Sequence, residues 1–225
     1  MNPNKIFLET GKKKTFAGAL DWPGWCRSGS GPDSALQALV DYGPRYAQVL
    51  QIGGIDFSPP LDISGLSIVE KAGGDATTDF GSPGFIFESD RAALTREELD
   101  LQKSILEACW AAFDRAAASA AGKELKKGPR GGGRDLDKII EHITEAERAY
   151  LGRLGRKFKR HEELDLTEEL TMARKAVLEA LDSAVKKGLP ESGPRGGVIW
   201  PVRYFLRRSA WHTLDHAWET EDRII

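Results

Sequence analysis

The chain has 225 residues, a formal net charge of −2, and 29% charged residues. This length allows one large domain or two small ones, and the near-neutral charge argues against electrostatic nucleic-acid binding, so no nucleic-acid partner is expected. The first residues lack the apolar run of a secretion signal, and no stretch approaches the roughly 18 apolar residues of a membrane helix, so we expect a cytoplasmic protein without a membrane partner.

The first 90 residues predict a small α+β module of order ββαββ. Short apolar runs on either side of the turn 11–14 indicate a hairpin over 5–22. Asp33 or Ser34 caps a following helix, which Gly43-Pro44 should kink or split in two. Two further short strands are expected at 67–70 and 85–88.

The two cysteines of the chain, Cys26 and Cys109, lie far apart in unrelated contexts. They do not suggest a disulfide framework, which fits a reducing compartment. Cys26 follows Trp25 in a turn rich in Gly and Ser, where its thiol could be exposed. Because no helix N-terminus or basic cluster adjoins it in sequence, we expect this thiol to be inert.

After Asp90 the apolar period becomes helical, with segments at 95–121, 135–156, 167–187 and 201–223. Thr95 and Glu98 form a capping box for the first of these, and Asp135 caps the second. These features predict an all-α four-helix bundle over residues 91–225. The phrase Gly-Pro-Arg-Gly-Gly occurs at 128–132 and at 193–197, and we interpret both copies as solvated turns rather than anion sites.

Aromatic side chains follow one face of the last predicted helix at heptad spacing: Tyr204, Trp211 and Trp218. Such stripes usually pack in a core rather than line a cofactor site. We expect this row to pack either against the α+β module or against a second subunit, which leaves a homodimer open.

Three of the four histidines form a candidate metal site. His212 and His216 are spaced i, i+4, so both imidazoles point from the same helix face. His142 lies on the border of the apolar stripe of helix 135–156, and antiparallel packing of the two helices would bring all three to the same depth. Three histidines with an open position are typical of a catalytic rather than a structural zinc centre. The alternative is that these histidines have a structural role and bind no metal.

The remaining polar candidates follow from this site. Neutral imidazoles suit a divalent metal ion, with zinc or nickel as the first choices. Glu145, one turn after His142, is a conceivable catalytic base, and Asp215 or Glu219 could orient a ligand imidazole. For each of these three acids, however, the sequence favours a solvated helix face. His161, in a charged loop, is expected to have no ligand role.

At these residues the sequence resembles the DinB-like superfamily, whose members bind a divalent metal through one histidine of the second helix and a His-x-x-x-His pair of the fourth. His142, His212 and His216 match that pattern. The resemblance covers about residues 91–225. It implies a four-helix bundle of up-down-down-up order and, in some relatives, transfer of low-molecular-weight thiols such as mycothiol or bacillithiol to electrophiles. Residues 1–90 resemble a HicB-like α+β fold, which is found in antitoxins.

Two functions of different class follow. The first is a metal-dependent enzyme that activates a thiol or water against a small-molecule substrate, of thiol S-transferase or hydrolase type. The second is a non-catalytic metal-binding protein with a regulatory or interaction role, antitoxin-like through residues 1–90. Turnover of a thiol and a model electrophile, with and without chelator, distinguishes the two.

Overall fold

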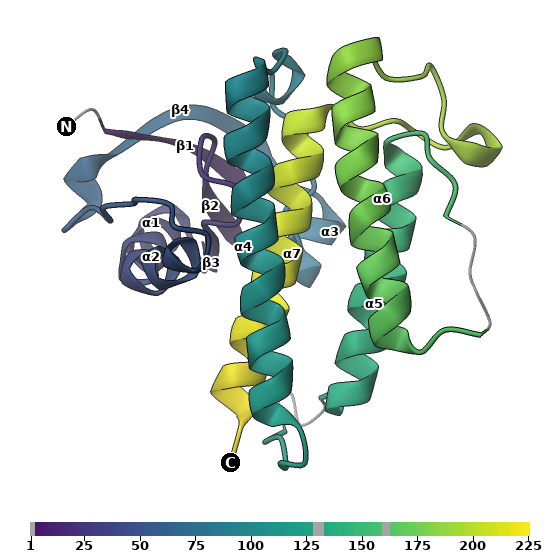
Figure 1. The fold of residues 1–225 in the computed structure, drawn as a ribbon. Coiled ribbons are helices and arrows are strands. Elements are labelled where there is room, and N and C mark those ends of the chain that lie inside the picture. Colours follow the sequence, from purple (N-terminus) through teal and green to yellow (C-terminus); the bar gives the residue numbers. More distant parts are fainter. Residues whose placement is uncertain (1–2, 128–132, 159–162) are drawn as a thin grey trace.

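The computed structural model describes residues 3–127, 133–158 and 163–225 and has an α+β architecture (Figure 1). His161 and the first Gly-Pro-Arg-Gly-Gly phrase lie outside the described residues. The second phrase forms a short 3-10 turn at Pro194–Gly196, as a loop reading predicts.

A mixed four-stranded sheet forms the N-terminal part, with strand order β3-β2-β1-β4. Its strands are β1 Asn4–Thr10, β2 Thr15–Ala19, β3 Cys26–Gly29 and β4 Leu66–Gly73. The antiparallel pairing of β1 with β2 confirms the predicted hairpin, and β4 pairs in parallel with β1 at the edge of the sheet.

Both faces of the two central strands are buried, because apolar or small residues occupy both sets of alternating positions. Ile6 and Leu8 share one face with alanines of β2 and pack in the same core as residues of α1 Pro32–Asp41 and α2 Gly43–Ile52. Phe7 and Phe16 lie on the opposite face, in a cluster with Trp211. The two helices meet at Tyr42, so the predicted split at Gly43-Pro44 is confirmed.

The predicted strand at 85–88 is wrong, and the order ββαββ is therefore wrong as well. Side chains rather than a neighbouring strand satisfy the backbone here. The buried carboxylate of Glu9 accepts the amides of Gly84 and Phe85, and Asp90 accepts that of Phe87 at 2.8 Å. The segment thus packs on the sheet without joining its ladder, while β3 supplies a strand that the sequence did not predict.

Four long helices follow, within three residues of the predicted bounds: α4 Arg96–Ala120, α5 Leu136–Arg153, α6 Leu166–Lys187 and α7 Val202–Arg223. The Thr95–Glu98 capping box and the Asp135 cap both form as predicted. After α5 the chain turns at Gly155, whose φ of 80° favours glycine, so this helix ends three residues before the expected bound.

The helices do not alternate simply up and down. Arg223 at the end of α7 donates to the carbonyl of Arg134, just before α5, and Trp200 before α7 donates to Arg153 at the end of α5. These bonds make α5 and α7 antiparallel. The ends of α4 and α7 meet through Lys126 and Arg223, so those two helices run parallel (Figure 1).

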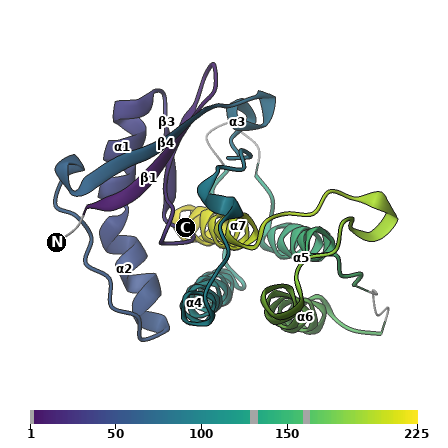
Figure 2. The same cartoon turned by 90° about the horizontal axis from the view of Figure 1, so that it is seen from above.

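Helix α7 lies at the centre of the molecule. Figure 2 shows α4 and α7 standing between the sheet with α1 and α2 on one side and the pair α5 and α6 on the other. Trp211 contacts Phe16 of β2 edge to face, and the Trp218 ring lies 5.2 Å from that of Tyr42. The aromatic row therefore packs against the N-terminal part, which is one of the two predicted arrangements. Among the described helices, none is long and apolar enough to cross a membrane.

Candidate metal centre

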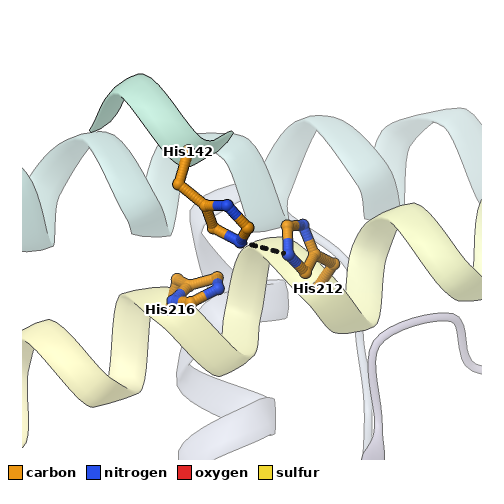
Figure 3. Close-up of side chains that lie close together, drawn as sticks. All are labelled: His142, His212 and His216. Atoms are coloured by element: carbon orange, nitrogen blue, oxygen red, sulfur yellow. Dashed lines mark hydrogen bonds between the residues drawn. The ribbon is translucent and has the colours of Figure 1, made fainter. Parts of the chain in front are cut away.

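Helices α5 and α7 bring three imidazoles together. His212 and His216 lie one turn apart on α7, and His142 reaches them from the antiparallel α5, so the three rings converge in the space between the helices (Figure 3). The ring centroids are 4.8–5.0 Å apart. The structure therefore brings together the three histidines that the sequence predicts as metal ligands.

The spacing of the ring nitrogens fits a shared cation. Nε2 of His142 lies 3.1 Å from Nε2 of His212, and one ligand atom from each of the three histidines lies within 4.8 Å of the others. Two nitrogens bound to one tetrahedral zinc at 2.0–2.1 Å are about 3.4 Å apart. No two of these ligand atoms exceed that separation by more than about 1.4 Å.

Burial keeps two of these imidazoles neutral. His212 is 8% exposed, and its burial holds its pKa well below the usual range. His142 is half-buried, and burial lowers its pKa to about 4, with nearby positive charge adding to the effect. A neutral imidazole keeps a free lone pair, so at neutral pH neither ring has to lose a proton before it binds a metal.

The third imidazole is oriented by a carboxylate. Nδ1 of His216 lies 2.8 Å from Oε2 of Glu219, and Oε1 of Glu219 accepts a hydrogen bond from Arg223 at 2.8 Å. The hydrogen bond from His216 lowers the pKa of Glu219, so the carboxylate is charged and Nδ1 is the donor. The predicted role of Glu219 as an orienting acid agrees with this geometry.

The other two acids lie elsewhere. Asp215 pairs with Arg27 of β3 at 3.3 Å, and within the described residues its carboxylate forms no hydrogen bond with an imidazole of the site. The reason is helical geometry, since a residue directly before His216 lies about 100° around the helix. Glu145 is exposed and lies one turn after His142. Its negative charge raises the pKa of His142, whereas burial lowers it.

Sequence reasoning missed two arginines at this site. Arg223 holds Glu219 and could have been found, because it lies four residues further along the same helix. Arg208 lies one turn before His212, and its charge adds to the effect of burial in lowering the pKa of that histidine. It also stacks on Trp211 at 4.7 Å and donates to the carbonyl of Pro83 at 2.8 Å.

The cysteines take no part in this centre. Both are buried and unpaired, and Cys26 lies in β3 rather than in an exposed turn. Within the described parts of the chain, His142, His212 and His216 form the one group of three or more metal-ligating side chains close enough to share an ion. No family model matches the chain, and no curated protein or solved structure matches it.

Proposed function

We propose that the chain binds a divalent metal ion, zinc or nickel, through His142, His212 and His216, and that it is a metal-dependent enzyme of the DinB-like type. The observation that carries the proposal is the convergence of three imidazoles from two antiparallel helices. Three imidazole ligands leave a fourth position for water or substrate, which is the ligand count of catalytic rather than structural zinc sites.

The donor set fits such an ion in two further respects. The Nε2 atoms of His142 and His212 face each other at 3.1 Å. Without a metal ion between them, one of these atoms must carry a hydrogen and donate it to the other. Glu219 holds the proton of His216 on Nδ1, which leaves Nε2 of that ring free to act as a ligand.

The same proposal includes a four-helix bundle formed by α4, α5, α6 and α7. Parallel α4 and α7, with α5 antiparallel to α7, agree with the up-down-down-up order that the DinB-like resemblance implies. The end of α6 meets the start of α4 through Lys103 and Asp182, so α6 runs in the same direction as α5. This order supports the proposal because a simple alternating bundle would make α5 and α7 parallel and separate their histidines in depth.

When bound, a divalent metal would lower the pKa of a coordinated water or thiol toward neutrality. The protein's own groups then have defined tasks. His142 is half-buried, so substrate would approach from its side rather than past the buried pair on α7. Glu145 is exposed one turn along α5 and is the candidate base that accepts the proton. The substrate is a small electrophile, with a low-molecular-weight thiol or water as its partner.

Metal analysis of protein purified without a histidine tag tests this proposal. We expect about one zinc or nickel ion per chain, lost from His212→Ala and from His216→Ala. Absence of metal after zinc reconstitution would overturn it. Activity is then assayed with a model electrophile and, in turn, bacillithiol, mycothiol, glutathione and coenzyme A, before and after treatment with a chelator. Bound metal without any turnover of thiol or water would favour the non-catalytic, regulatory alternative.

A further inference from the structure

A second polar pocket lies on the neighbouring face of α7. It has a volume of about 200 Å³ and is lined by the sheet and the helix together. Lys14 precedes β2, Arg27 belongs to β3, and Trp211 and Asp215 belong to α7. At about 30 Å³ per water molecule, this space holds roughly six or seven waters, which is the size of a small organic group.

The pocket adjoins the histidine cluster through α7. Trp211 directly precedes His212 and Asp215 directly precedes His216, so the pocket and the imidazoles lie about 100° apart around the same two turns of helix. The rings of Trp211 and His212 are 6.1 Å apart. A ligand group held here would therefore be close to whatever binds at the histidines.

Positive charge exceeds negative charge in this pocket. Two cations, Lys14 and Arg27, face one carboxylate, that of Asp215. Arg27 reaches Asp215 through Nη1 alone, at 3.3 Å. Within the described residues, the partly buried Lys14 ammonium has no hydrogen-bond or ion-pair partner. An ammonium group without a protein partner is free to pair with a bound anion.

The cation-bearing elements are fixed before any ligand arrives. Asp79 of α3 Ala76–Phe80 accepts the backbone amides of Lys13 and Lys14, at 2.7 and 3.3 Å, and so holds the turn that carries Lys14. The segment around α3 is held in turn by the buried Glu9 carboxylate, which accepts the hydroxyl of Thr78 at 2.6 Å. A turn whose backbone is already held loses little conformational freedom when a ligand binds.

Arg27 is likewise fixed in place. Its guanidinium stacks on the ring of Tyr42, 3.9 Å from the centroid, and lies 5.4 Å from that of Trp218. No hydrogen bond among the described residues uses its Nε or Nη2. These two nitrogens form one edge of a planar fork, which matches the two oxygens of a carboxylate.

We propose that this pocket binds the carboxylate of a small organic monoanion, with Lys14 and Arg27 as the binding cations. A single negative charge suits the net charge of +1 that two cations and Asp215 give, whereas a phosphate dianion would be repelled by Asp215. A last step rests on the proposed function. In that case the acid is the substrate of the metal centre, and the N-terminal sheet anchors its carboxylate.

The test uses the full chain in metal-free form, so its result does not depend on the metal. Acetate and propionate are titrated while the Trp211 indole N–H and the Arg27 side-chain N–H are followed by nuclear magnetic resonance. We expect saturable binding that Lys14→Met and Arg27→Met each weaken at least about tenfold. Lys13→Met, in the same turn but outside the pocket lining, is the matched control and should bind as the parent does.

Three results would overturn the proposal: no saturable binding, an equal loss in Lys13→Met, or tighter binding of inorganic phosphate than of acetate. Arg27→Lys keeps the charge and should retain part of the affinity, which separates lost binding from misfolding. Zinc content of Lys14→Met should equal that of the parent. A protein that binds no zinc but still binds acetate would therefore overturn the proposed function, while the assignment of the pocket as a carboxylate site would stand.

Discussion

Glu219 accepts a hydrogen bond from Nδ1 of His216 at 2.8 Å, across one turn of α7. Its second oxygen is held by Arg223, which also donates to the carbonyls of Lys126 and Arg134. The arginine thus connects the site to the loop between α4 and α5. This chain of bonds fixes the His216 tautomer and directs its free Nε2 lone pair toward the other imidazoles.

Glu219→Ala should weaken zinc binding by about 10–100-fold, because His216 then loses the partner that fixes its tautomer and orientation. Glu219→Gln keeps an acceptor but loses the charge, and should give an intermediate affinity. Competition titration against a coloured chelator measures both. Glu221→Gln is the control, since Glu221 lies on the same helix but pairs with Arg45. An equal loss of affinity in Glu221→Gln would show that the effect is general electrostatics.

Each ligand histidine should be required for metal occupancy. His142→Ala, His212→Ala and His216→Ala each remove one of three protein ligands, and water replaces that bond poorly, so we expect their metal content to fall to near zero after dialysis. His161→Ala should retain the metal. Thermal unfolding of metal-free samples checks folding, with only modest changes expected. Full occupancy in His142→Ala would contradict the three-histidine site and direct the search to nearby carboxylates.

Much of the fold could be predicted because its helices carry local signals. The Thr95–Glu98 capping box and the Asp135 cap both begin helices as expected, and Gly43-Pro44 divides α1 from α2. The parallel pairing of β1 with β4 could not be predicted, since it joins residues about sixty positions apart with no local pattern. Likewise β3, with the sequence Cys-Arg-Ser-Gly, lacks the apolar alternation of a strand.

The candidate site could likewise be predicted only in part. The spacing of His212 and His216 and the depth of His142 follow from helix geometry, so their meeting could be predicted. The partner of Asp215 could not, because Arg27 reaches it from β3, and no sequence signal shows which face of the sheet covers α7. The second pocket was missed for this reason: its cations and its carboxylate come from segments that only the tertiary fold brings together.

Cys26 should react slowly with iodoacetamide in the folded protein. Its side chain is 2% exposed, and burial raises the pKa of its thiol to about 12, so almost no thiolate is present at neutral pH. We expect labelling at least about a hundredfold slower than in urea-unfolded chain. Mass spectrometry of timed samples measures both rates. Rapid labelling of Cys26 ahead of Cys109 in folded protein would contradict the buried position.

Glu147 gives the folded protein a pH-dependent stability that is independent of the metal. This side chain is 4% exposed, and burial raises its pKa to about 7, while Arg174 opposes that effect in part. In the unfolded chain the pKa is about 4.3. The folded state therefore holds this proton more tightly than the unfolded chain does. The contribution of Glu147 to the free energy of unfolding is complete below the pKa of the unfolded chain and is lost as pH rises through about 7.

Glu147→Gln should remove this loss, because a neutral amide of the same shape needs no proton. Arg174 keeps its two hydrogen bonds to Asp114, at 2.8 and 2.9 Å, so the variant leaves that arginine paired. Unfolding by urea is measured at about pH 5 and pH 8. We expect similar stability at the lower pH and, at the higher pH, a variant more stable than the parent by on the order of a few kcal/mol. If parent and variant lose the same stability between the two pH values, another group carries the dependence and Glu147 is charged when folded.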